Sequence, residues 1–291
     1  MSTLSIGISG LMAANLGLTT TGHNIANAST PGYNRQLIVQ GTNIAVLTGS
    51  GFVGQGTNVQ TVKRVYDQFL YKQVLTAQSS VSEMDAYMSQ ISQIDNLLAD
   101  TSAGLSPSLT DFFDGVQEVA ANPSSIAARQ SMISSAEALA SRFQSLDQRL
   151  TEIRSGVNSQ IVSEVAVINS YSKQIAELNH QIILARAGSQ SQEPNDLLDQ
   201  RDQLVADLNK EIGVTTVIQS DGSYNLFFGN GQPLVVGTLN YSLTAKAAAD
   251  DPERMVVAME LTGGNRVELP ESQITGGTLG GLVSFRSETL D

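Results

Sequence analysis

The sequence predicts a mainly α-helical protein with a smaller antiparallel β unit, the helices forming an elongated multi-helix coiled-coil rod. Long stretches carry apolar residues at heptad spacing, which is typical of helices that pack side by side. Beyond residue 213 the period changes to two, with Gly-containing turns between the apolar runs, which is typical of β-hairpins. Aromatic residues make up 5% of the 291 residues and Trp is absent, which indicates thin helical cores.

The first helix is expected to begin near residue 3 and to end before the Ser-Thr-Pro-Gly sequence at residues 29–32. Its apolar residues recur at the a and d positions of a heptad, with one Asn at such a position that would fix the register of packing. We call this set the N-terminal seam: Leu4, Ile8, Leu11, Asn15, Leu18 and Ile25.

Charge is almost absent from this first segment. Between Met1 and Val62 there is no Asp, Glu or Lys, and Arg35 is the one Arg. A helix on the surface of a globular protein carries a charged face, and each interior Gly costs about 1 kcal/mol relative to Ala. We therefore expect a segment that is poorly ordered alone and becomes ordered when other subunits cover it. The alternative is a Gly-rich core helix of a globular domain.

Apolar periodicity divides the chain into four parts. Residues 1–62 contain the heptad helix, a turn and a short Gly-rich β region, and residues 63–212 contain the long helices of the rod. A seam on residues 70–98 and another on residues 132–182 predict two long antiparallel helices, with a short third helix beside them. Residues 213–275 form the β unit, and residues 276–291 begin another helix.

The turn after the first helix carries a distinctive sequence. Residues 24–35 read Asn-Ile-Ala-Asn-Ala-Ser-Thr-Pro-Gly-Tyr-Asn-Arg, which resembles the signature of the bacterial flagellar axial proteins of rod, hook and hook-filament junction. Residues 195–204 and 276–286 resemble the hook-filament junction members in particular. The residues expected to shape this turn motif are Asn24, Ala26, Asn27, Pro31, Gly32, Tyr33 and Arg35.

The resemblance implies a structural subunit that self-assembles at the hook-filament junction and joins hook to filament, with the N-terminal seam packed against neighbouring subunits around the export tube. Implied partners are like subunits, the flagellar hook protein, a second junction protein and a cytoplasmic export chaperone. Type III export without a cleaved signal would place the protein outside the cell. Members of the family end with a second heptad helix that this sequence lacks, which suggests a truncated form. A rod or hook subunit is the nearest alternative.

Composition argues against several other classes. A net charge of -12 disfavours nucleic acid and anionic membranes as partners, and the absence of Cys excludes thiol chemistry. Neither His23 nor His180 has the sequence context of a catalyst. We therefore expect no enzyme activity, cofactor or metal. The acidic residues Asp196, Asp199, Asp202 and Asp207 are expected to form a solvated helix face rather than a metal site.

Residues 49–54 match G-x-G-x-x-G, the glycine pattern of dinucleotide-binding loops. A genuine fingerprint opens a helix that holds the pyrophosphate at its N-terminus. The residues that follow, 57–62, are β-branched and lack a helical period, so we expect a strand there. A nucleotide-binding enzyme that uses this loop remains the alternative from another functional class.

Overall fold

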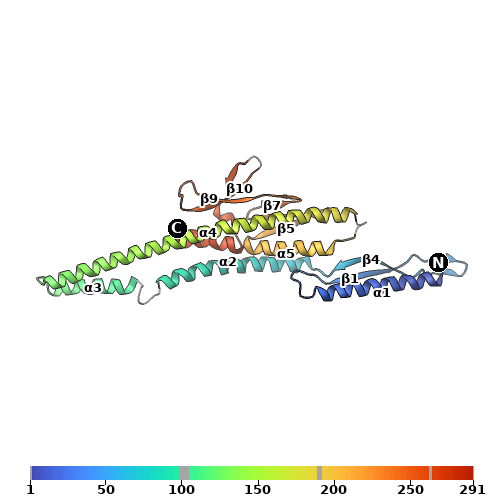
Figure 1. The fold of residues 1–291 in the computed structure, drawn as a ribbon, viewed down its shortest axis with the longest axis horizontal. Coiled ribbons are helices and arrows are strands. Elements are labelled where there is room, and N and C mark those ends of the chain that lie inside the picture. The colour runs from blue at the N-terminus through green and yellow to red at the C-terminus, as the bar shows by residue number, and fades with distance from the viewer. Residues whose placement is uncertain (1, 99–104, 189–191, 262–263, 291) are drawn as a thin grey trace. The chain divides into compact units, whose positions relative to one another are not determined.

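The computed structural model describes residues 2–98, 105–188, 192–261 and 264–290, in which it contains six α-helices and eleven short strands (Figure 1). All strand pairs among these residues are antiparallel. The predicted mainly α fold with small antiparallel sheets is therefore confirmed. The chain forms two compact units, which are described separately. The first contains Met1–Ala77, Asn169–Asn209 and Val214–Ser242, and the second contains the remaining residues.

In the first unit, helix α1 (Thr3–Ala26) begins after the N-cap Ser2 and packs on a two-stranded sheet of β1 (Gln36–Thr42) and β4 (Thr57–Arg64). The inner face of α1 is made of small residues. Ala13 and Thr20 are buried there, and Gly17 lies close to Ile38 of β1. Strands β2 (Val46–Thr48) and β3 (Gly51–Val53) form a separate hairpin between β1 and β4. Small side chains thus let α1 approach the sheet closely.

The rest of the first unit packs the last residues of α4 (Ile126–Gly188) and most of α5 (Asn195–Glu211) with a four-stranded sheet. Its strands are β5 (Val214–Ile218), β6 (Tyr224–Phe228), β7 (Gln232–Val236) and β8 (Leu239–Asn240). The predicted hairpin at residues 221–222 is present, although the loop spans residues 219–223, with Gly222 at a φ of 86°. Apolar side chains from both helices and the sheet form the core: Ile175, Ile182, Leu198, Val205, Leu208, Leu226, Phe228 and Leu234.

The second unit contains α2 (Gln68–Leu98) from residue 78 onward, α3 (Leu105–Ala121) and the first two thirds of α4. Helices α2 and α4 run antiparallel, and the Gln90 amide donates a hydrogen bond to Gln160 Oε1 at 3.0 Å. Strands β9 (Leu243–Ala247), β10 (Met255–Glu260) and β11 (Arg266–Glu268) form a second sheet. Helix α6 (Gly277–Phe285) and a π turn, Arg286–Leu290, follow. The strands predicted at residues 213–275 thus lie in two separate sheets.

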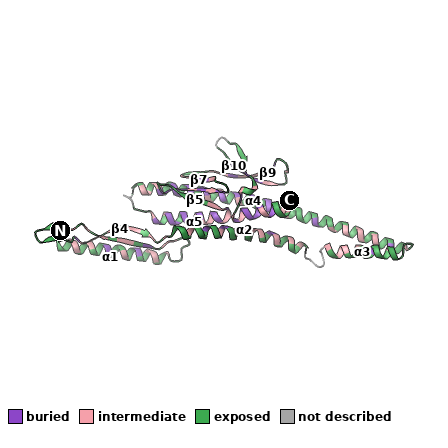
Figure 2. Cartoon of the chain, turned by 180° about the vertical axis from the view of Figure 1, so that it is seen from behind, coloured by how far each residue is buried: buried purple, intermediate pink, exposed green. Residues whose placement is uncertain are grey.

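The seam predicted on residues 70–98 does not face the core, and this expectation was wrong. The buried side chains of α2 are instead Leu75, Ser79 and Gln90. Gly281 of α6 explains part of this choice of the buried face of α2. A Cβ at residue 281 would collide with the Glu83 carbonyl, so the two helix backbones approach closely on that side. Ile91 is partly buried, whereas six of the seam side chains are each more than half exposed: Leu70, Val74, Val81, Met84, Met88 and Leu98. Figure 2 shows exposed positions along much of α2.

A pair of carboxyl groups in the second unit should make stability depend on pH. Burial, together with a hydrogen bond to Glu211, raises the pKa of Glu164 from an ordinary 4.5 to about 7. The folded protein therefore holds a proton that the unfolded chain releases between these values. We expect the urea midpoint to fall as the pH rises from about 4.5 to about 7.

Glu164→Gln should flatten this pH dependence, measured by circular dichroism in urea across the same pH range. Glu152→Gln is the matched control, because Glu152 lies on the same helix with a side chain that is 69% exposed. An equal pH slope in the wild type and in Glu164→Gln would contradict the assignment.

Candidate functional site

The turn motif, residues 24–35, ties the end of α1 to the start of β1 through one amide side chain. Asn24 Nδ2 donates to the Gln36 carbonyl at 2.8 Å, and Asn24 Oδ1 accepts from the Gln36 amide at 2.8 Å. The Tyr33 hydroxyl donates to the same Oδ1 at 2.6 Å. Asn24 thus extends the hydrogen-bond pattern of the sheet onto the helix and fixes the angle between them.

The turn itself is held by successive backbone hydrogen bonds. The Asn27 amide and Asn27 Nδ2 both donate to the His23 carbonyl at 3.1 Å, which ends the helix. The Thr30 amide donates to the Asn27 carbonyl at 2.9 Å. Gly32 has a φ of 77°, and a Cβ at this position would overlap Gln203 of α5. Only Gly combines this left-handed conformation with so close an approach at low cost.

Helix α5 contacts the motif through the buried carboxylate of Asp199, and Arg64 links Asp199 to a second buried carboxylate, Asp202. Asp199 accepts from the Asn34 amide at 2.9 Å and from Asn34 Nδ2 at 2.8 Å. Arg64 Nη1 donates to Asp199 at 2.7 Å and to Asp202 at 2.8 Å. We call Arg64, Asp199 and Asp202 the Arg64 clamp. It joins the end of β4 to α5 across more than 130 residues of sequence.

Charged and aromatic groups surround the clamp and make further contacts with it. The two carboxylates raise the pKa of Arg64, although burial of the guanidinium acts in the opposite direction. Burial and the charge of Asp202 raise the pKa of Tyr224 to about 12, so its hydroxyl stays protonated and donates to Asp202 at 2.8 Å. Arg201 lies over the Tyr224 ring, 3.4 Å from its centroid. The clamp is therefore part of a buried polar network.

The expectation of a solvated acidic face was wrong for two of its members. Asp199 and Asp202 are 5% and 3% exposed, whereas the Asp196 side chain is 59% exposed and accepts from Gln36 at 2.7 Å. Residue spacing along α5 could not show that Arg64 would neutralise these carboxylates. One available signal was that Arg64 closely follows a long segment without acidic residues.

The N-terminal seam lies on the face of α1 opposite its contacts with the sheet. Leu4, Leu11, Leu18 and Ile25 are each more than 70% exposed, and Ile8 is 47% exposed. Asn15 is exposed on the same helix. The structure therefore brings the seam residues together on one bare, uncharged surface, which we call the outer face of α1. No described residue of the first unit covers it.

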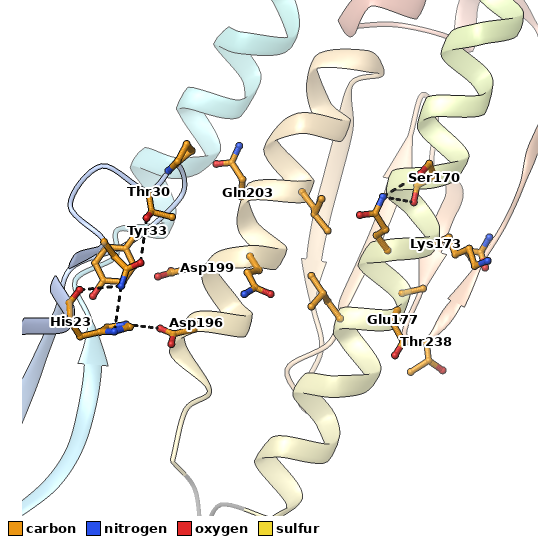
Figure 3. A pocket seen from close by; sticks show the side chains of 18 residues that line it. His23, Thr30, Tyr33, Ser170, Lys173, Glu177, Asp196, Asp199, Gln203 and Thr238 are labelled. Carbon is orange, nitrogen blue, oxygen red and sulfur yellow. Dashed lines mark hydrogen bonds and ion pairs between the residues drawn. The ribbon is translucent and has the colours of Figure 1, made fainter. Parts of the chain in front are cut away.

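The motif residues divide into two groups. Asn24, Asn27, Gly32 and Tyr33 make the contacts given above, while Ala26, Pro31 and Arg35 are exposed. Next to them, the first unit has an open hollow of about 1090 Å³, and Figure 3 shows His23, Tyr33, Asp196 and Gln203 among its lining side chains. His23 lies 3.3 Å from Asp196 Oδ1, which gives it a structural contact.

The glycine-rich residues 49–56 contain the turn after β2, strand β3 (Gly51–Val53) and the connection to β4. Strand β4 begins at Thr57, directly after it, where a dinucleotide fingerprint would open a helix. In the part of the chain that the structure describes, no helix has the length and apolar character needed to cross a membrane. The same residues contain no cluster of three or more His, Asp or Glu side chains placed to hold a metal ion.

Removing the cation of the clamp should destabilise the first unit. Arg64→Met leaves two buried carboxylates without their partner, and we expect a loss of about 3 kcal/mol or more in the free energy of unfolding. Lys63→Met is the matched control, because Lys63 is the exposed neighbour on the same strand and the charge change is equal. Urea titrations followed by circular dichroism measure both, and equal midpoints would contradict a stabilising clamp.

Two family models match the chain. Residues 91–291 match the helical domain of flagellar hook-associated protein FlgK, and residues 4–34 match the flagella basal body rod protein family. A solved structure, that of the flagellar hook junction protein FlgK from Burkholderia pseudomallei, is similar with a TM-score of 0.68 and 40% sequence identity. The match covers 75% of this chain and 39% of that chain.

Curated relatives agree with these matches. The flagellar hook-associated protein 1 of Salmonella typhimurium is 42% identical over 290 residues, and that of Escherichia coli is 39% identical over 291 residues. Both alignments cover 100% of this chain but 52% and 53% of the relatives, so the chain spans about half their length. The chain therefore belongs to the FlgK family of flagellar hook-associated proteins.

Proposed function

We propose that the chain is part of a structural subunit that self-assembles at the junction of flagellar hook and filament and joins the two. The family supports this function, since the relatives are hook-associated proteins and the similar solved structure is a hook junction protein. One observation carries the proposal for this chain. Helix α1 is anchored to the sheet on its inner face, and its outer face is apolar, uncharged and bare.

The energetics favour covering this face with other subunits. Burying a Leu or Ile side chain contributes on the order of 1.5–3 kcal/mol, and the outer face offers five of them: Leu4, Ile8, Leu11, Leu18 and Ile25. No Asp, Glu or Lys lies on α1, so contact with a similar surface desolvates no ionic group. Together these gains can exceed the entropic cost of association.

The turn motif and the Arg64 clamp hold α1 in an orientation that leaves its outer face accessible to other subunits. Asn24, Tyr33 and Asn34 fix the angle of α1, and Asp199 connects them to α5. Where α1 is folded, these contacts limit the directions in which the helix can lie, which reduces the conformational entropy lost when it becomes ordered on assembly. The proposed mechanism is mechanical and involves no catalytic step.

The proposed partners are like subunits, the flagellar hook protein on one side, a second junction protein on the other and an export chaperone before assembly. Such a location requires that the protein leave the cell, and we propose type III export without a cleaved signal peptide. The motif at residues 24–35 and the rod-protein match at residues 4–34 support membership in this exported axial assembly.

Charge on the outer face should abolish assembly. In the full-length protein, Leu11→Asp combined with Leu18→Asp should leave the stability of the monomer unchanged, because both side chains are more than 70% exposed. Incorporation into flagella and swimming should be lost, since carboxylates would be buried without partners. Ser163→Asp is the control, a charge added at an exposed position of α4. Normal filaments and motility in the double variant would overturn the proposal.

Hydrogen exchange should measure directly whether other subunits cover the outer face of α1 after assembly. In the free full-length protein we expect the amides of residues 4–32 to exchange rapidly, because an isolated Gly-rich helix is marginal. In assembled flagella the same amides should become protected, while α5 is protected in both states. Equal and strong protection of residues 4–32 in the free protein would contradict ordering upon assembly.

A further inference from the structure

Helix α6 runs beside α2 in the second unit, and the two helices point in the same direction. Just before α6, a Cβ on Gly276 would overlap the Ser79 hydroxyl. Further along, the Phe285 ring packs edge-on against the Tyr87 ring, with the centroids 6.0 Å apart. Contacts on α2 thus advance from residue 79 to residue 87 as those on α6 advance toward its end. The C-terminal end of α6 is therefore directed toward the C-terminal end of α2.

The turn that follows α6, Arg286–Leu290, is held between α2 and α4. The Tyr87 and Thr289 hydroxyls lie 3.2 Å apart, which joins the turn to α2. Arg286 Nη1 donates to Asn158 Oδ1 of α4 at 3.2 Å, and Arg286 is 1% exposed. In Figure 1 the red helix α6 lies beside α4, near the end of the chain marked C. The described chain thus leaves α6 in the space between two long helices.

A groove of about 640 Å³ continues between α2 and α4 beyond this turn. On α2 it begins at Gln90, about one helical turn after Tyr87, and on α4 it extends from Gln160 to Arg142. Because α2 and α4 are antiparallel, both walls extend away from α6 in the same direction. The walls carry apolar and amide side chains from both helices, among them Gln90, Gln93, Leu97, Leu146, Ile153 and Gln160.

One face of α2 serves both α6 and the groove. Glu83 and Ala86 lie against the glycines of α6. Gln90, Gln93 and Leu97 continue the same face at spacings of three and four residues and line the groove. Helix α6 therefore covers the first half of a helix-packing face, and the second half has no helix on it among the described residues.

Two features of α4 indicate that something outside the described residues fills the groove. A Cβ on Gly156 would meet no atom within 4 Å, although Gly is unfavourable in a helix interior. A bare backbone there allows another helix to approach closely. Arg142 Nε is shielded from solvent and has no hydrogen-bond partner among the described residues. Because an unpaired buried donor is costly, the occupant should supply an acceptor oxygen.

We propose that the segment following residue 291 in the full-length protein extends the helix of α6 and docks in this groove. The chain spans about half the length of its curated relatives, which leaves ample length for such a segment. Direction identifies the occupant, because α6 delivers the next residues to the mouth of the groove. A segment of the same chain also has a high effective concentration there, which disfavours a second copy. The contact does not depend on the junction function, since it lies within one chain.

Length and chemistry specify the segment further. From Asn158 to Arg142 the α4 wall is about 24 Å long at the usual helical rise, so about 16 helical residues follow it. We expect apolar side chains at spacings of three and four residues that face Leu97, Leu146 and Ile153. An Asp or Glu near the far end would pair with Arg142. An amphipathic helix with one acidic residue near its end thus completes the groove.

Photocrosslinking in the full-length protein tests this contact. Benzoylphenylalanine replaces Asn96, an exposed residue of the α2 wall, and isotopically labelled and unlabelled monomers are mixed before irradiation. Crosslinked peptides should come from the roughly 20 residues that follow residue 291, and each should carry a single label. Ser163, which is exposed on α4 outside the groove, is the control position and should give no crosslink to that segment.

Two results of this experiment overturn the proposal. Crosslinks that join labelled to unlabelled chains identify a second copy as the occupant. The absence of crosslinks from residue 96 to the segment, including a result in which residue 96 reacts with another protein, shows that the segment lies elsewhere. Both results leave the junction function standing, because the outer-face variant of α1 tests that function separately.

A side chain at residue 156 should block docking. In the full-length protein, Gly156→Leu should speed hydrogen exchange of amides 142–160 about tenfold, since an overfilled contact is destabilised. In the chain that ends at residue 291 the same change should not speed exchange, because the new side chain meets open space. Ser163→Leu is the matched control and should have no such effect at either length. Faster exchange at both lengths, or at neither, would contradict the proposal.

Discussion

The contact between Arg64 and the two carboxylates of α5 is the interaction on which the first unit depends. Arg64 is the last residue of strand β4, and Asp199 also accepts hydrogen bonds from Asn34 of the turn motif. One buried ionic cluster thus anchors the start of β1 and the end of β4, which lie side by side at one end of the sheet, to α5. Because removal of one partner leaves a buried charge, alternative placements of the segment are costly. The clamp therefore contributes specificity as well as stability.

The N-terminal segment has polar contacts with α5 on one side and exposed apolar side chains on the other. Asn34 and Gln36 make directional hydrogen bonds to α5, and Asn24 and Tyr33 make such bonds within the segment. On the outer face and on the hairpin the segment uses apolar side chains, whose contacts have no fixed direction. Hydrogen bonds thereby set the geometry within the unit, while the exposed apolar surfaces impose no direction of their own. This division explains how a segment nearly without charge can be accurately placed.

Local periodicity predicted most of the fold. The heptad spacing and the Gly and Pro positions gave helices at α1, α2, α4 and α5 close to their observed bounds, and the β-branched run at residues 57–62 gave β4. The turn motif could be singled out because its sequence is distinctive. Hydrogen-bond partners were not predictable, since Asp199 meets Asn34 across 165 residues. Pattern alone shows no such pairing.

The α2 seam shows a second limit of sequence patterns. Heptad spacing shows which side chains share a helix face, but not whether that face meets the rest of the same unit. Gly281 of α6 approaches the Glu83 backbone closely, and the buried side chains of α2 in this unit are the polar residues Ser79 and Gln90. The exposed seam residues from Val81 to Leu98 thus give the second unit an apolar helix face of its own.

The long sequence separation within the clamp also bears on how the protein is made. Ribosomes deliver Arg64 well before Asp199 and Asp202, so roughly 130 further residues must be translated before the anchor exists. Throughout that interval the N-terminal segment lacks its ionic contact with α5. The order of translation therefore leaves the exposed apolar side chains of α1 on a segment that is not yet anchored to α5.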